Sequence, residues 1–181
     1  MPIRAACLDS GGQYTANAYR FAAQRLRRRV WAIKGRGGAG VKPWPGKPSK
    51  GKGGGMVFTI GVDAFKDQLA ARLAIAEPGP GHVHFSAELA VEWFDQLTAE
   101  RKRIRHVNGR PVPEWVPHRD GARNEALDCN VYATAALHGL YAMGLRLNEE
   151  AARLAPSEPQ PEPGAGAAPR PAVFKSQWIG R

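Results

Sequence analysis

Three aspartates stand where a folded chain could gather carboxylates around divalent metal ions. Asp9 ends the apolar run 5–8, Asp63 ends the apolar run 56–62, and Asp128 lies inside a long alanine-rich segment with helical periodicity. Two-metal phosphodiester hydrolysis needs oxygen ligands on rigid elements, because the ions must hold both the attacking water and the leaving oxygen. Carboxylates clustered without cations would repel one another. The pattern predicts a metal-dependent phosphodiester-cleaving site in which these three residues are the metal ligands and catalytic groups.

Each aspartate also has an ordinary structural explanation. Asp9 could lie in a turn before two glycines, and Asp63 could cap the helix that follows it. Asp128 could be a solvated helix residue or could pair with Arg123. The metal interpretation is favoured by the combination of all three with a basic chain and a loop rich in glycine and lysine.

Other side chains near the aspartates could assist the site. Asp67 is four residues after Asp63, one helical turn away, and its alternative is a solvated helix face. Asn124 and Glu125 lie within one turn of Asp128. A histidine at position 84 alternates with another at 82 on a predicted strand, and a structural role is the alternative for both. The accessory candidates are Asp67, His84, Asn124 and Glu125.

The charge of the chain points to a polyanionic partner. The 181 residues include 26 Lys and Arg against 16 Asp and Glu, which gives a net charge of +10. A cationic surface attracts nucleic acid by long-range steering and counterion release. Nucleic acid is therefore the first partner to consider, and a basic protein without such a partner is the alternative.

The segment 35–55 is the most unusual in composition. It holds nine glycines, three prolines and no acidic residue, so we expect a long mobile loop that contributes nothing to a core. It lacks the spacing of a nucleotide-binding Gly-rich loop. The cations in and beside this loop are the predicted DNA contacts: Lys34, Arg36, Lys42, Lys47, Lys50 and Lys52.

Apolar periodicity predicts the elements that would position these residues. Strands are expected at 3–8, 30–34, 56–62 and 82–85, helices at 14–28, 65–73, 89–97 and 122–143, and a hairpin around Asn108-Gly109 with arms 101–107 and 111–116. If strands 3–8 and 56–62 lie side by side, Asp9 and Asp63 emerge at one sheet edge. The pattern is that of an α/β domain over 1–154, followed by a Pro/Ala/Gly-rich flexible tail at 155–181.

Cysteine usage and hydropathy indicate a reduced, cytoplasmic protein. Cys7 and Cys129 form neither a disulfide framework nor a zinc motif, and both are expected to be buried thiols. The N-terminus has no secretory pattern, and no apolar run is long enough to cross a bilayer.

Several ordered motifs resemble one family, the C-terminal nuclease domain of the GpA-type large terminase subunit of tailed phages. The resemblance covers about Ile3 to Leu145. It is carried by Leu-Asp-Ser-Gly-Gly at 8–12, Val-Trp-Ala-Ile-Lys-Gly at 30–35, Gly-Val-Asp at 61–63 with Lys66-Asp67, Pro-Gly-Pro-Gly at 78–81 leading to His84-Phe85, and Arg-Asn-Glu-Ala-Leu-Asp-Cys at 123–129 with Val-Tyr-Ala at 131–133.

The resemblance implies a ribonuclease H-like mixed sheet flanked by helices and an endodeoxyribonuclease that uses Mg²⁺ or Mn²⁺. Such an enzyme cuts concatemeric double-stranded DNA during genome packaging in the bacterial host, with the phage portal and small terminase subunit as partners. By position, the family's first acidic ligand falls on Asp9, its helical one on Asp128 and its middle one on Asp63.

The resemblance does not extend to an ATPase motor, since no Walker motif precedes Asp9. We therefore expect an excised domain, a split gene product or a prophage remnant. The alternatives are a resolvase- or transposase-like nuclease of the same superfamily, or a non-catalytic DNA- or portal-binding remnant.

Overall fold

The structure, a computed structural model, describes residues 2–154 apart from the side chain of Lys52, and the predicted tail lies outside the described residues. The chain divides into two compact units, one that ends at Leu145 and one that begins at Arg146. The described part of the second unit contains helix α5 (Leu147–Leu154). In residues 2–154 no helix is long and apolar enough to cross a membrane.

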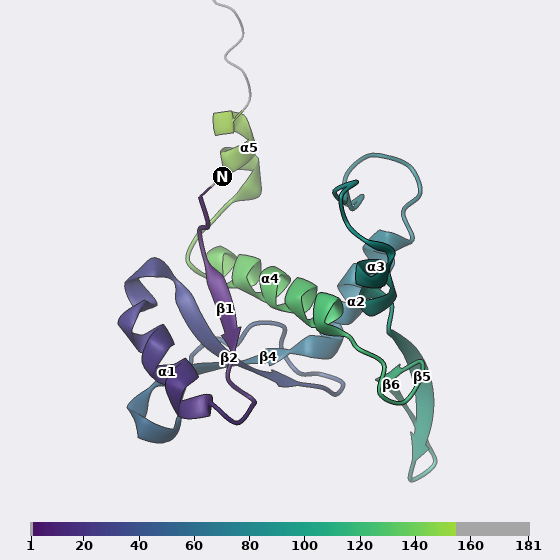
Figure 1. Cartoon of the computed structure of the whole chain (residues 1–181), viewed down its shortest axis with the longest axis horizontal. Coiled ribbons are helices and arrows are strands. Elements are labelled where there is room, and N and C mark those ends of the chain that lie inside the picture. The colour runs from purple at the N-terminus through teal and green to yellow at the C-terminus, as the bar shows by residue number, and fades with distance from the viewer. Residues whose placement is uncertain (1, 155–181) are drawn as a thin grey trace, which may run out of the picture. The chain divides into compact units, whose positions relative to one another are not determined.

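A mixed four-stranded sheet organises the first unit (Figure 1). Its strands, in spatial order, are β1 (Ala6–Asp9), β2 (Val30–Arg36), β4 (Met56–Gly61) and β3 (Ser49–Lys50). The first three are parallel, and β3 is antiparallel to β4. The expected pairing of β1 with β4 is wrong, because β2 lies between them. Short connections tend to place consecutive parallel strands next to each other, which explains the position of β2 beside β1. Because β1, β2 and β4 are all parallel, the carboxyl ends of β1 and β4 still face the same way.

Helices cover both faces of this sheet (Figure 1). Helix α1 (Thr15–Gln24) buries Tyr19 against Ala32, and the 3₁₀ helix η1 (Leu26–Arg28) follows it. Helix α4 (Glu125–Ala142) packs on the other face, where Val131 lies in one cluster with Ile33. Ala32 and Ile33 fall in different clusters because successive strand residues point to opposite faces. The sheet is therefore buried on both sides, as its apolar strands predict.

The remaining elements of the first unit follow β4. Helix α2 (Val62–Leu73) starts directly at the end of β4, and α3 (Val91–Leu97) precedes the ribbon formed by β5 (Glu100–Val107) and β6 (Arg110–Pro117). The ribbon is a separate two-stranded sheet. Its turn residues Asn108 and Gly109 have φ of 52° and 75°. Two positive φ values are typical of a type I′ turn, which confirms the predicted hairpin.

The loop 35–55 differs from its prediction. Trp44 packs on Phe58 at 4.9 Å between ring centroids and on Trp31 at 5.2 Å, so the segment does contribute to the core. The backbone N–H of Gly61 donates to the carbonyl oxygen of Lys42 at 3.0 Å. The segment also contains β3 and the 3₁₀ helix η2 (Lys52–Gly54). One large aromatic side chain thus anchors a stretch whose average composition is typical of a loop.

Two smaller predictions are also wrong. The segment 82–85 forms no strand, because Phe85 turns its ring into a cluster with Trp93 and Phe94. Cys129 is exposed, whereas Cys7 is partly buried. Burial raises the pKa of the Cys7 thiol to about 12, so this cysteine is a neutral packing group.

Candidate carboxylate site

Asp9 stands at the end of β1 with an exposed side chain. Its Oδ1 accepts a hydrogen bond of 2.9 Å from the backbone N–H of Gly11. A Cβ at position 11 would lie 3.3 Å from the same oxygen, so glycine leaves room for this arrangement. The next residue, Ser10, is buried and donates its hydroxyl to the carbonyl oxygen of Ile33 at 2.7 Å. Asp9 therefore does lie at a turn, as its structural explanation expected, and this turn leaves most of its carboxylate exposed to solvent.

Asp128 lies in the first turn of α4 and is partly buried. Burial raises the pKa of its carboxyl group above the usual range, and the negative charges of Glu100 and Asp9 raise it further. The nearby ammonium of Lys66 acts in the opposite direction. Asp9 and Asp128 are therefore close enough to interact electrostatically. Helix α4 packs against β1, the strand that ends at Asp9, so these two predicted site residues lie on neighbouring elements.

Tyr132 follows Asp128 by one helical turn and faces the same pair of carboxylates. Burial raises the pKa of its phenol, and the charges of Asp128 and Asp9 add to the effect. The phenol is therefore neutral near pH 7 and available as a hydrogen-bond donor. A neutral donor beside two carboxylates can stabilise their charge or orient a bound phosphate.

Asp63 occupies a different position from this pair. Its Oδ2 accepts a hydrogen bond of 2.8 Å from the backbone N–H of Gly38, in the glycine-rich loop. Strand β1 ends at Asp9, opposite Ile33, whereas β4 ends at Gly61, opposite Arg36. The end of β4 is thus about 10 Å further along β2 than Asp9 and two strand spacings, about 10 Å, away across the sheet.

The helix-capping interpretation of Asp63 is not what the structure shows. The residue that caps α2 is Gly61, without a side-chain hydrogen bond, and Asp63 lies inside the first turn. Among the residues that the structure describes, no group of three His, Cys, Asp or Glu side chains is close enough to hold a metal ion. The charge of Asp9 reaches Asp128, but the described residues form no three-ligand cluster.

A buried ion pair next to Asp128 was missed by the sequence analysis. Lys66 Nζ lies 2.6 Å from Glu100 Oε2, and Asn124 Nδ2 donates to Glu100 Oε1 at 2.9 Å. The sequence signal for this buried pair was the position of Lys66, which lies three residues before Leu69 among the apolar residues that α2 buries. A lysine at such a position needs a partner. Asn124, predicted as an accessory residue, acts here through Glu100.

The other accessory candidates have partners of their own. Asp67 Oδ1 accepts hydrogen bonds from Lys102 Nζ at 2.8 Å and from Trp115 Nε1 at 2.9 Å. Glu125 is exposed and pairs with Arg123 at 3.1 Å, so Arg123 does not pair with Asp128. The ring of His84 lies 4.6 Å from the ring of a second histidine, His82.

The predicted DNA-binding cations are solvent-accessible wherever their side chains are described. All five such residues are exposed: Lys34, Arg36, Lys42, Lys47 and Lys50. None of the five forms an ion pair with a described residue, so each keeps its full charge for a partner. In the sequence these cations lie on both sides of Gly38, whose backbone N–H binds the Asp63 carboxylate.

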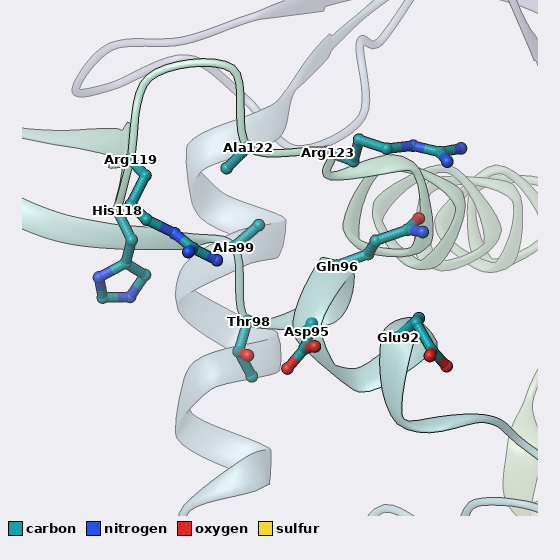
Figure 2. A pocket seen from close by; sticks show the side chains of 9 residues that line it. All are labelled: Glu92, Asp95, Gln96, Thr98, Ala99, His118, Arg119, Ala122 and Arg123. Atoms are coloured by element: carbon teal, nitrogen blue, oxygen red, sulfur yellow. The ribbon is translucent and has the colours of Figure 1, made fainter.

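A cavity of about 540 Å³ lies where α3, the end of β6 and the segment leading to α4 meet (Figure 2). Asp95 and Glu92 border it from α3, and Arg119 and His118 border it from the other side. None of the three predicted ligands lines it. Its lining mixes acidic and basic side chains, so the cavity does not coincide with the predicted metal site.

Comparison with known proteins agrees with the order of the motifs. Residues 1–151 match the family described as terminase large subunit gpA, endonuclease domain. The terminase large subunit of Escherichia phage lambda is 38% identical over 147 residues, which cover 76% of this chain and 22% of that protein. The chain thus spans about a fifth of this relative.

No solved structure matches the chain. The α/β architecture with a mixed sheet flanked by helices is confirmed, while its ribonuclease H-like character stays a prediction. The family match covers well over half of the 181 residues and includes every motif noted in the sequence. The chain therefore belongs to the terminase large subunit gpA endonuclease-domain family.

Proposed function

We propose that this chain is a divalent-metal-dependent endonuclease that cuts concatemeric double-stranded DNA during phage genome packaging. The observation that carries the proposal is the placement of Asp9 at the end of β1, against which α4 packs with Asp128 in its first turn. Family membership supplies the substrate class. The phage portal and the small terminase subunit are the proposed protein partners, and the bacterial cytoplasm is the proposed location.

The donor set at the pair suits Mg²⁺ or Mn²⁺. Both ions prefer oxygen ligands, and Mg²⁺ in phosphoryl-transfer sites is commonly held by one or two carboxylates together with waters and substrate phosphates. Asp9 is exposed and Asp128 is only partly buried. Burial is the main reason that the pKa of Asp128 is raised, and the negative charge of Asp9 adds to it; a bound cation would favour the ionised form of Asp128 against both effects.

The proposed mechanism assigns a task to each residue of the pair. Asp9 and Asp128 would hold the ion, which supplies charge stabilisation at the scissile phosphate and a nucleophilic water. Tyr132, with its neutral phenol, would donate a hydrogen bond to a phosphate oxygen or to Asp128. The Lys66–Glu100 pair would fix α2 and the N-terminus of α4 and so keep Asp128 in place. In the two-metal form of the proposal Asp63 is a ligand of the second ion, which requires its carboxylate to leave Gly38 and approach the other two, because the ions of two-metal sites lie only about 4 Å apart.

The second candidate is a DNA- or portal-binding module that has lost catalysis. It is favoured by the separate position of Asp63, whose carboxylate is bound by Gly38. A resolvase- or transposase-like nuclease would share the acids but prefer branched DNA. Comparing a branched with a linear duplex substrate distinguishes that possibility from the proposed packaging nuclease.

Plasmid nicking in millimolar Mn²⁺ tests the proposal. We expect the wild type to nick, and Asp9→Asn and Asp128→Asn each to reduce the rate at least about 100-fold, since even the outer-shell partners of a metal ligand are worth 10–100-fold. Asp120→Asn is the matched control, because Asp120 is exposed and outside the pair. A wild-type protein without Mn²⁺-dependent nicking would favour the non-catalytic module.

The same assay tests the middle ligand. Asp63→Asn is expected to reduce nicking strongly if the two-metal form is correct, because an amide keeps the shape but loses the charge that holds an ion. Normal nicking by Asp63→Asn would mean that the middle ligand is misassigned. Asp67→Asn would then be measured next.

A further inference from the structure

The β5–β6 ribbon has two chemically different faces. Residues paired across antiparallel strands lie on the same face, and successive residues alternate between faces. On one face the pairs are Arg101 with Val116, Arg103 with Glu114, Arg105 with Val112, and Val107 with Arg110. All four arginines on this face are exposed. This set is called the arginine face below: Arg101, Arg103, Arg105 and Arg110.

The opposite face attaches the ribbon to α2. Lys102 and Trp115, which are paired across the strands, both bind the Asp67 carboxylate, at 2.8 Å and 2.9 Å. Glu100, the first residue of β5, is held by Lys66 at 2.6 Å. Since α2 holds one face of the ribbon, the arginine face is left to solvent.

The arginines are spaced and oriented as a set. Arg101, Arg103 and Arg105 recur at every second residue, which places them about 7 Å apart along the strand. Glu114 contacts Arg103 at 2.8 Å and Arg105 at 3.2 Å, so one carboxylate orients two guanidinium groups. Arg101 and Arg110 form no ion pair within residues 2–154, which leaves the face strongly positive.

This geometry fits duplex DNA. The major groove is about 12 Å wide and admits a two-stranded β-ribbon, while guanidinium groups on its surface can reach phosphates on both sides. The base of the ribbon adjoins the carboxylate site, because Asn124 binds Glu100 and directly precedes the helix that carries Asp128. DNA held by the ribbon would therefore lie next to Asp9 and Asp128.

We propose that the β5–β6 ribbon is a duplex-DNA docking element that enters the major groove with its arginine face and delivers the strand to the carboxylate pair. The inference rests on the proposed function for its choice of DNA as partner. It assigns a separate surface from the lysines of the glycine-rich loop, and it predicts binding that survives loss of the catalytic carboxylates.

The test is duplex binding without divalent ions, measured by fluorescence anisotropy at several salt concentrations. The ribbon variant carries Arg101→Gln, Arg103→Gln and Arg105→Gln. We expect its affinity at 0.1 M salt to fall at least about tenfold and the slope of log K against log salt to flatten by about 3, one per lost phosphate contact. The control variant carries the same charge change at exposed cations outside the ribbon, the glycine-rich loop and the cluster 25–29: Arg20→Gln, Arg72→Gln and Arg146→Gln.

One further measurement checks that charge sets the salt slope, and another separates groove docking from general charge. The variant Arg101→Lys with Arg103→Lys and Arg105→Lys keeps the charge, so its salt slope should match that of the wild type. The ribbon variant should lose less affinity for a single strand of the same length than for duplex. Equal losses in the ribbon and control variants, or equal losses on duplex and single strand, would overturn the proposal.

Binding without metal keeps this test independent of cleavage. A wild type that binds DNA through the ribbon but never nicks contradicts the nuclease proposal and leaves the ribbon assignment standing. A wild type that nicks while the ribbon variant binds with unchanged affinity contradicts the ribbon assignment alone. Circular dichroism of each variant confirms that the exposed substitutions leave the fold intact.

Discussion

Lys66 and Glu100 form an ion pair of 2.6 Å whose side chains are only 10% and 7% exposed. The two residues come from α2 and β5, and Asn124 adds a hydrogen bond from the residue before α4. Breaking a buried pair by removing one partner leaves the other charge desolvated and uncompensated. This contact therefore joins three elements beside Asp128 at a point where a single substitution is costly.

We predict that Glu100→Gln lowers the free energy of unfolding by about 3 kcal/mol, because Lys66 keeps its buried charge and loses the opposite one. Urea unfolding measures this. Glu114→Gln is the matched control, since Glu114 pairs with exposed arginines and surface pairs are worth less than about 1 kcal/mol.

A double variant checks the cause of this loss. Replacing both partners with apolar residues of similar size, Lys66→Met with Glu100→Leu, should recover most of the stability, since no unpaired charge is left buried. Similar small effects of Glu100→Gln and Glu114→Gln would contradict the interpretation.

We predict that Mn²⁺ raises the melting temperature of the wild type. The ion binds the native carboxylate pair and relieves the repulsion between Asp9 and Asp128, so it stabilises the folded state alone. A concentration 100 times the dissociation constant corresponds to about 2.7 kcal/mol. The control is the double variant Asp9→Asn with Asp128→Asn, which should show no shift. An equal shift in both proteins would show that Mn²⁺ binds elsewhere.

The pH dependence of stability follows from the raised pKa of Asp128. A carboxyl whose pKa is higher in the folded state than its ordinary value of 3.8 binds its proton more tightly when folded. Its contribution to stability is therefore present below pH 3.8 and is lost as the pH rises through the folded pKa. We predict that Asp128→Asn removes this decrease, so the unfolding free energy of the variant minus that of the wild type should rise as the pH rises through the folded pKa of Asp128. A pH-independent difference would contradict the direction of the shift.

Local patterns were sufficient for most of the secondary structure. The hairpin at Asn108-Gly109 and the helix around Val131 were predicted because turn chemistry and apolar periodicity act within a few residues. The position of β2 between β1 and β4 was not predicted, because the order of strands in a sheet depends on how the connections between them cross over, which local patterns do not determine. Trp44 was missed for another reason, because the average composition of a glycine-rich segment conceals one anchoring side chain.

The candidate site also combines features that local sequence patterns predict with features that only the tertiary structure reveals. Asp9 and Asp128 were predicted because each stands at a recognisable place on a strand or helix. The hydrogen bond between Gly38 and Asp63 spans 25 residues, and the bond between Lys66 and Glu100 spans 34. Pairings over such separations leave no local periodicity, so the tertiary structure was needed to find them.

The last prediction concerns the lysines of the glycine-rich loop, which are expected to bind DNA phosphates without reading sequence. Neutralising Lys42, Lys47, Lys50 and Lys52 together, each to glutamine, should weaken duplex binding and flatten the salt slope by up to about 4. Mn²⁺ stabilisation should be unchanged. Because the anchor of the loop is Trp44 rather than these lysines, the fold should persist. Unchanged affinity and slope would mean that the loop is solvated and that DNA contacts lie on the ribbon or in the cluster 25–29.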